Sequence, residues 1–210
     1  MAALSKALSP APEQAALAIF GALHEGDETL VLLGPHEPGF WACFTASSEY
    51  QDGQADPLDR WSKRVIGGLA ADWGGVAVFP SDGPPYAPFL DWALKTGQAW
   101  QSPVGMLVHA RAGLMVSYRG AVRLKGRLSL APAGASPCES CAAKPCLSAC
   151  PVGALNASMA YDVPGCQAHI QSAAGEDCLT AGCLVRRACP VSQDYGRLAA
   201  QSAFHMRSFL

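Results

Sequence analysis

The cysteines of this chain are concentrated in one short stretch near its C-terminal end. The sequence of 210 residues holds nine cysteines, eight of which lie between Cys138 and Cys189, while Cys43 stands apart. Thiols that gather in this way in a reducing cytosol usually bind metal, because disulfides rarely persist there. The first group reads Cys-x2-Cys-x4-Cys-x3-Cys-Pro, and the second, more widely spaced group also ends in Cys-Pro. The spacing therefore predicts a metal-binding module.

The two Cys-Pro endings indicate how the cysteines divide between two metal centres. In bacterial ferredoxins with two [4Fe–4S] clusters, a tight loop supplies three ligands, and the cysteine before the proline serves the other cluster. Applied here, this crossed arrangement uses all eight cysteines in two sets of four. The first set is Cys138, Cys141, Cys146 and Cys189, and the second is Cys150, Cys166, Cys178 and Cys183.

The alternative to iron–sulfur clusters is a pair of structural zinc sites. Zinc ribbons usually carry paired CxxC motifs, and this chain has a single CxxC, at Cys138 and Cys141. The spacing thus favours clusters over zinc. The ninth cysteine, Cys43, is expected to be a buried apolar residue in a strand rather than a further ligand.

Composition and charge exclude several classes of function. Half of the residues are apolar, and 15 basic against 17 acidic residues give a net charge of −2, without the basic surface that nucleic acids select. The sequence has no apolar run of the roughly 18–20 residues that a membrane helix needs. The N-terminus also lacks the basic start and long apolar stretch of a secretory signal. We therefore expect a cytoplasmic protein without a nucleic-acid or membrane partner.

The hydrophobic pattern before the cysteines predicts an α/β domain over residues 1–130. A small, proline-rich linker at 130–137 then leads into an α-rich module over residues 131–210. Apolar periodicity and turn residues are the basis for the individual elements. We expect helices over 12–24, 58–73 and 87–95, and strands over 29–33, 40–45, 76–79, 105–109, 114–118 and 121–130.

The cysteine module resembles that of the epoxyqueuosine reductases and their relatives, the reductive dehalogenases. The resemblance rests on the two Cys-Pro motifs and on a separate cysteine in YDVPGCQAHI (161–170). Upstream, ADPLDRWSKRVIGGLA (55–70) and the stretch over 88–122 are similar to that family's substrate domain. The resemblance implies a flavin-reductase-like α/β domain followed by a ferredoxin-like two-cluster module. In the full enzymes, cobalamin lies between the two and takes electrons from the nearer cluster.

The chain departs from this family at two active-site positions. The family's Gly-Lys-Asn segment, which approaches cobalamin, matches residues 102–104, which are Ser-Pro-Val here. The family's catalytic aspartate falls on Pro85, with Asp82 the nearest acid, so no catalytic residue is assigned. His109 and Tyr118 are each either a proton donor or a hydrogen-bonded, half-buried group. The residues proposed to line a cofactor cavity are Trp100, Ser102 and His109.

The sequence as a whole predicts an electron-transfer protein that carries two [4Fe–4S] clusters and exchanges electrons with a redox partner protein. The alternative is an oxidoreductase related to the epoxyqueuosine reductases. In it, cobalamin, flavin or another small acceptor held by the N-terminal domain would receive the electrons. Lys144, Arg186 and Arg187 lie within the cysteine loops, where they either balance cluster charge or form a solvated surface.

Overall fold

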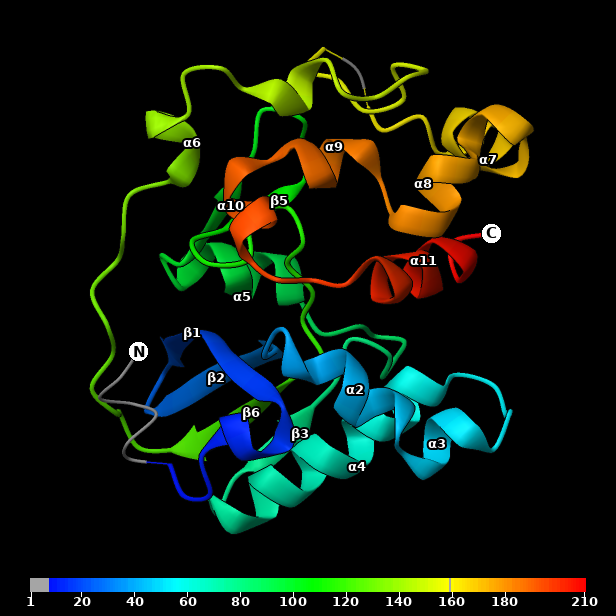
Figure 1. The fold of residues 1–210 in the computed structure, drawn as a ribbon. Helices are drawn as coiled ribbons and strands as arrows, with labels where there is room; N and C mark the ends of the chain where they lie inside the picture. The colour runs from blue at the N-terminus through cyan, green and yellow to red at the C-terminus, as the bar shows by residue number, and fades with distance from the viewer. Residues whose placement is uncertain (1–7, 159) are drawn as a thin grey trace. The chain divides into compact units, whose positions relative to one another are not determined.

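The computed structural model describes residues 8–158 and 160–210 (Figure 1). Its internal contacts divide the chain into two compact units, each assembled from two stretches of sequence. We call the residues up to 98 together with 117–134 the sheet unit, and residues 99–116 with 135–210 the cysteine unit. Residues 99–116, which the sequence assigns to the domain over 1–130, belong to the cysteine unit. Over the described ranges, no helix has both the length and the apolar character needed to cross a membrane.

A four-stranded antiparallel sheet forms the centre of the sheet unit (Figure 1). The strand order is β1-β2-β6-β3. Residues Leu30 to Leu33 of the central strand β2 are fully buried, so the sheet supplies the core of this unit. The strands are β1 (Leu17–Glu25), β2 (Glu28–Pro35), β3 (Val76–Val78) and β6 (Gly120–Lys125).

Helices accompany this sheet, and large aromatic side chains pack between two of them. The longest helix, α4 (Pro57–Asp72), begins with a proline in its first turn and lies against β3 and β6. Its Trp61 is buried, with the rings of Phe40 and Phe44 at 5.3 and 6.1 Å between centroids. The remaining helical segments are η1 (Pro12–Ala15), α2 (Gly39–Thr45), α3 (Ser48–Gln51) and α5 (Phe89–Lys95).

The helix expected over 12–24 is wrong, because this segment forms η1 and then strand β1. Residues 17–23 are all buried. A strand covered on both faces is apolar throughout, and a short window of such a run also matches helical periodicity. Gly21 adds to the preference for a strand. It lies at an irregularity in the β1–β2 register with φ of +143°, where a Cβ would come within 2.6 Å of Thr96.

The strand expected over 40–45 is also wrong, because these residues belong to helix α2. Phe40 and Phe44 stand four residues apart, so a helix places both on one face, where they meet Trp61. Tertiary packing thus overrides the β preference of the aromatic residues. Cys43 points away from this face and is exposed, which corrects its expected burial.

Most of the other expected elements are present. The strand at 29–33, the helices at 58–73 and 87–95, and the strands at 76–79 and 121–130 correspond to β2, α4, α5, β3 and β6. The expected pairing of 105–109 with 114–118 is wrong. Strand β5 (Leu107–His109) pairs instead with β4 (Ala99–Gln101), and residues 114–118 contain no strand.

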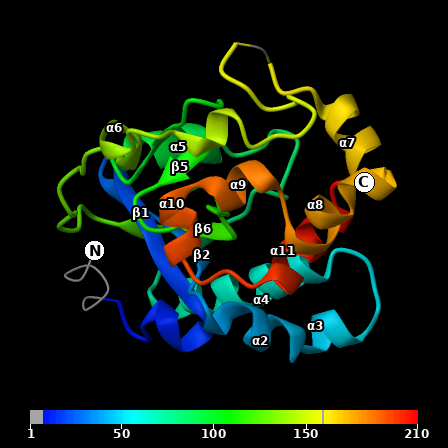
Figure 2. The same cartoon turned by 45° about the horizontal axis from the view of Figure 1, so that its top comes forward.

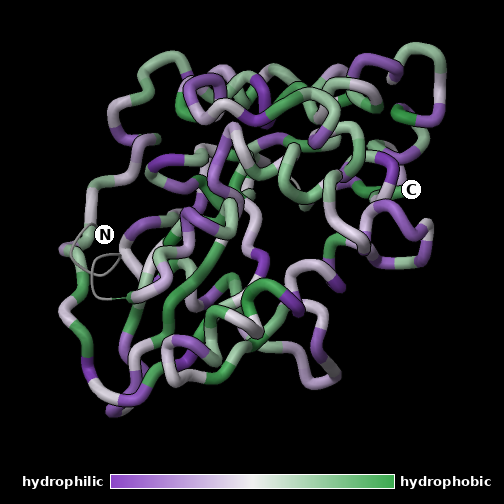
Figure 3. Tube along the Cα trace, turned by 60° about the horizontal axis from the view of Figure 1, so that its bottom comes forward, coloured by the Kyte–Doolittle hydropathy of each residue, from purple (hydrophilic) through white to green (hydrophobic). Residues whose placement is uncertain are grey.

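Short helices make up the rest of the cysteine unit. Helix α8 (Glu176–Ala181) lies beside α11 (Ala199–Arg207), and α9 (Leu184–Ala188) packs on α10 (Pro190–Asp194), as Figure 2 shows. The others are α6 (Pro137–Ser140), η2 (Pro145–Leu147), α7 (Val163–Gln171) and η3 (Ala173–Gly175). Hydrophobic and hydrophilic stretches alternate along the trace (Figure 3). The chain is thus a mixed α/β protein with a small antiparallel sheet and many helices.

Candidate metal centres

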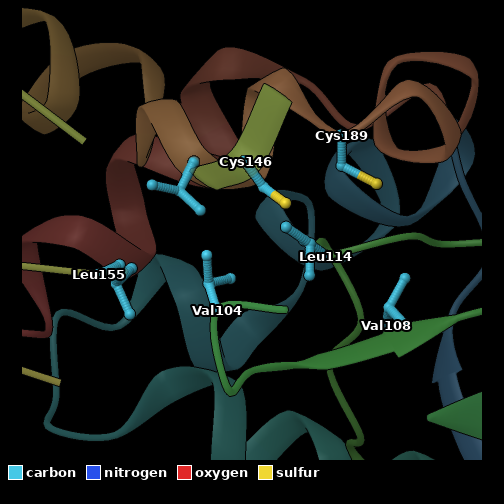
Figure 4. Close-up of a cluster of buried hydrophobic side chains, with 7 residues drawn as sticks. Val104, Val108, Leu114, Cys146, Leu155 and Cys189 are labelled. Carbon is cyan, nitrogen blue, oxygen red and sulfur yellow. The ribbon is translucent and has the colours of Figure 1, made fainter. Parts of the chain in front are cut away.

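The first predicted set of four cysteines lines a single cavity of about 250 Å³ in the cysteine unit. Its wall contains the thiols of Cys138, Cys141, Cys146 and Cys189, together with apolar side chains that include Val108, Leu114 and Val191. Figure 4 shows Cys146 and Cys189 in the same cluster of buried side chains as Val104, Val108 and Leu114. We call this space the first cavity.

Local backbone geometry presents these four thiols. Ser136 caps α6 by accepting a hydrogen bond from the Cys138 amide at 3.3 Å, with Pro137 in the first turn. Lys144 has φ of +40° and leads into η2, which carries Cys146. Cys189 is the extended residue between α9 and α10, and α9 packs against η2. This packing brings the most distant cysteine of the set to the other three.

The second predicted set lines another cavity of the cysteine unit. Cys150, Cys166, Cys178 and Cys183 surround it with mainly apolar neighbours, among them Leu155, Ile170 and Val185. We call this space the second cavity. Its volume is about 20 Å³, which is room for about one water molecule. Its walls would therefore have to separate to admit a cluster, whereas the first cavity is already open.

Separate elements supply the ligands of the second cavity. Cys166 lies in α7, whose first turn is capped by Asp162 accepting from the Gly165 amide at 3.0 Å. Cys178 lies in α8, and the chain turns at Gly182, with φ of +96°, before Cys183 begins α9. Cys150 lies three residues after the end of η2, so the first group of cysteines contributes its last member here.

The electrostatic neighbours of the thiols follow the same division. Burial raises the pKa of Cys146, and the thiols that raise it further are Cys138, Cys189 and Cys141. Burial likewise raises the pKa of Cys166, where the contributing thiols are Cys183 and Cys150. Cys189, the last cysteine of the second group, therefore acts on a thiol of the first cavity. Cys150, the last cysteine of the first group, acts on a thiol of the second cavity.

Three polar contacts join residues 114 and 115 to helix α9, to helix α10 and to the segment between α10 and α11. The Leu114 amide donates to Ser192 Oγ at 2.8 Å, and Arg197 Nη1 donates to the Met115 carbonyl at 3.0 Å. Arg186 Nη1 donates to the Leu114 carbonyl. Gly113 lies against the segment that carries Cys189, since a Cβ there would stand 2.6 Å from the Ser192 amide and 3.1 Å from Cys189 Sγ. No local pattern in the sequence indicates this long-range role.

The residues proposed to line a cofactor cavity lie at different places in the cysteine unit. Ser102 is buried and lines the first cavity, and its Oγ has no hydrogen-bond partner among the described residues. Trp100 packs against the apolar cluster that contains Cys146 and Cys189. His109 is buried, and its Nδ1 accepts hydrogen bonds from the amides of Arg111 and Ala112, both at 3.2 Å. The imidazole therefore closes the turn that follows β5.

Two other residues considered from the sequence belong to the sheet unit. Asp82 pairs with Lys63 at 2.7 Å on an exposed surface. Tyr118 is buried edge-on against Phe20, with ring centroids 6.0 Å apart, and burial raises the pKa of its hydroxyl.

Two residues outside the cysteine sets interact with the thiols of the second set, and the sequence indicates Arg186 but not Tyr161 as a candidate. The hydroxyl of Tyr161 forms a hydrogen bond with the thiol of Cys166, and Arg186 acts electrostatically on Cys183 and Tyr161. Tyr161 immediately precedes the Asp162 cap, and Arg186 stands midway between Cys183 and Cys189. Only its position next to Asp162 would have drawn attention to Tyr161.

Within the described ranges, no group of three or more histidine, cysteine or acidic side chains converges as the ligands of a single metal ion would. Cluster ligands have a different requirement, because each thiolate binds its own iron atom at a separate corner. The donor set of four thiols in an apolar wall fits such a cluster at both cavities, with the widening already noted at the second. Comparisons with protein-family models, curated proteins and solved structures found no match.

Proposed function

We propose that this protein transfers electrons by means of two [4Fe–4S] clusters, one held at each cavity. The observation that carries the proposal is the crossed division of the thiols. Cys189 shares a cavity with Cys138 and Cys141, whereas Cys150 lines the other cavity. Clusters bound there would supply one-electron transfer. The proposal includes a ferredoxin-like role for the cysteine unit, a flavin-reductase-like fold for the sheet unit, and a redox partner protein in the cytoplasm.

The chain's own residues would perform three tasks in this function. The thiols would lose their protons on binding iron, because thiolates are the ligands, and burial now raises the pKa of Cys138, Cys146, Cys166 and Cys178. Apolar walls would exclude water from the centres. Pro151 and Pro190 follow Cys150 and Cys189 directly. Because proline has no backbone N–H group, neither position would offer a hydrogen-bond donor next to its cysteine.

Iron and acid-labile sulfide in protein purified without oxygen test this proposal directly. We expect about eight of each per chain from two four-iron clusters, and a brown colour that dithionite bleaches. One or two zinc ions without sulfide would contradict the proposal and favour the structural zinc alternative. If dithionite cannot reduce the bound iron, the proposal that the thiols hold iron would stand, but the proposal that these centres transfer electrons would be contradicted.

A reductase remains the second candidate because a further cavity adjoins both thiol sites. It measures about 470 Å³ and is lined by residues 101–106 and by Leu155, Asn156 and Tyr161. Ser102 and Pro103 also line the first cavity, and Leu155 the second. A small acceptor bound in this space would lie close to both centres.

Anaerobic titration with flavin and with cobalamin distinguishes the two candidates. Residues 102–104 offer proline and valine where a lysine and an asparagine would supply hydrogen bonds, so we expect cobalamin to bind no tighter than about millimolar. Micromolar binding with a shift of the corrin band would establish the reductase instead. Flavin binding of that strength would have the same meaning for a flavin acceptor.

A further inference from the structure

Arg186 brings a positive charge into the cysteine unit, where it acts electrostatically on Cys183, one of the thiols that line the second cavity. It lies on α9, and its Nη1 donates a hydrogen bond to the carbonyl oxygen of Leu114. Burial of the guanidinium lowers the pKa of Arg186, while Cys183 and Tyr161 act in the opposite direction. Among the described residues, no carboxylate forms an ion pair with it. A buried cation without a carboxylate is costly unless another negative group compensates it.

Tyr161 adds a hydrogen bond to the same group of thiols. Its hydroxyl is joined to the sulfur of Cys166, and its ring stacks on Phe209 with centroids 6.1 Å apart and planes inclined by 11°. When Cys166 is a thiolate, only the tyrosine hydroxyl has a proton to donate. Two thiols that line the second cavity therefore have such a neighbour: Cys183 is acted on by the Arg186 charge, and Cys166 by the Tyr161 hydroxyl.

The charged groups nearest to the thiols are otherwise at the surface. Lys144 lines the first cavity but is exposed, so water screens its charge. Asp162 acts on Cys166 and Asp177 on Cys178, and both carboxylates are also exposed. Arg187 pairs with Asp177, which reduces the effect of each on its surroundings. The charge of Arg186, held in protein rather than water, is the least screened of this set.

We infer that Arg186 and Tyr161 raise the reduction potential of the centre at the second cavity above that of the first. The inference rests on the proposed function, because it assumes a redox group at each cavity. Reduction adds one electron to a centre and one negative charge, with no bond made or broken. A nearby cation and a hydrogen bond to a ligand sulfur both stabilise the more negative, reduced state. Electrons supplied by a low-potential donor therefore collect at the second cavity.

Anaerobic redox titration followed by paramagnetic resonance tests this inference on the full chain, with dithionite as the donor. The signal of the second centre is identified as the one altered in Cys178→Ser. In Arg186→Gln, we expect the ratio of reduced to oxidised second centre at a fixed potential to fall about tenfold, a shift of ~59 mV for one electron. The potential of the first centre should shift less, since Arg186 reaches that cavity only through its hydrogen bond to the Leu114 carbonyl. Tyr161→Phe should produce a smaller shift in the same direction.

Matched variants separate buried charge from charge in general. Arg186→Lys retains the positive charge and should retain most of the potential, while Arg187→Gln removes a paired charge at the surface and should shift it little. Equal shifts of both centres, or none at either, in loaded Arg186→Gln would overturn the inference while leaving the proposed function intact. If Arg186→Gln fails to take up iron, Tyr161→Phe decides, and an unchanged second potential there overturns the inference. Wild-type protein without iron and sulfide would overturn both.

Discussion

The sheet unit and the cysteine unit differ in what their interiors are made of. The sheet unit is built on paired strands whose side chains are apolar and fully buried, as at Leu30 and Val31. Over its described residues, the cysteine unit has only the short β4–β5 pair as strands, and its longest helices, α7 and α11, have nine residues each. Isolated helices of that length are unstable in water, where about 12–15 residues are needed. We therefore expect hydrophobic burial to stabilise the sheet unit, and the cysteine unit to depend also on the proposed binding of clusters by its thiols.

Removal of iron should have the largest effect, and it should act on one unit only. We expect a strong iron chelator under reducing conditions to unfold the cysteine unit, because metal binding and folding are coupled where the ligands come from separate elements. The sheet unit should persist. Hydrogen exchange measured by peptide should then lose protection over α7 to α11 but keep it over β1 and β2. Loss of protection in both units, or in neither, would remove the contrast between them.

Single cysteine changes should sharpen the comparison within the cysteine unit. Cys189→Ser should abolish the same resonance signal as Cys138→Ser, and Cys150→Ser the same signal as Cys178→Ser, each with loss of about half the iron. The physical reason is the crossed division of the thiols between the two cavities. Cys43→Ser is the matched control, since this exposed thiol lies in the sheet unit and should change neither signal. If Cys150→Ser instead matches Cys138→Ser, the crossing is wrong.

Gly113→Ala should destabilise the cysteine unit by about 1–3 kcal/mol. Its φ is +54°, and the added Cβ would stand 2.6 Å from the Ser192 amide. Gly105→Ala is the control in the same unit, with φ of +78° and no atom within 4 Å of its Cβ, so it carries the backbone strain without the clash. Urea unfolding of the loaded protein, followed through cluster absorbance, measures both. Equal effects of the two changes would contradict the close approach.

Glu49→Gln should have the smallest effect and should act on the sheet unit alone. The hydrogen bond from Arg64 lowers the pKa of Glu49 from 4.5 to about 2. The ionised carboxylate therefore stabilises the fold above pH 4.5, and this contribution is lost as the pH falls towards 2. We expect Glu49→Gln to cost at most about 2 kcal/mol at pH 7, because the partner Arg64 side chain is 57% exposed and solvent screens the pair.

Urea unfolding followed by tryptophan fluorescence at pH 7 and near pH 2 checks the role of Glu49. The difference between wild type and Glu49→Gln should shrink at the lower pH. Asp52→Asn is the control, since Asp52 pairs with Arg60 at 2.8 Å at the surface and should matter less. A Glu49→Gln effect that is independent of pH would show that packing rather than charge explains it.

The sequence predicts the grouping of the thiols better than it predicts the fold. Cysteine spacing predicts which thiols share a cavity, because it depends on a short motif and on a known crossing. Strand β1 could not be told from a helix, since its fully buried residues leave no alternation to read. The place of residues 99–116 in the cysteine unit depends on contacts such as Leu114 with Ser192, which join residues far apart in the chain. Arg186 is visible in the sequence, but its burial is not.

The discontinuity of the cysteine unit has a consequence for how such a protein could arise and be inherited. Val104, Val108 and Leu114 form part of the wall around Cys146 and Cys189, yet they are encoded before the last strand of the sheet. A gene segment that begins at residue 135 would encode all eight clustered thiols without this wall. Recombination at that point would transfer an incomplete module. During synthesis, too, the ribosome must release residues 99–116 well before the helices that cover them exist.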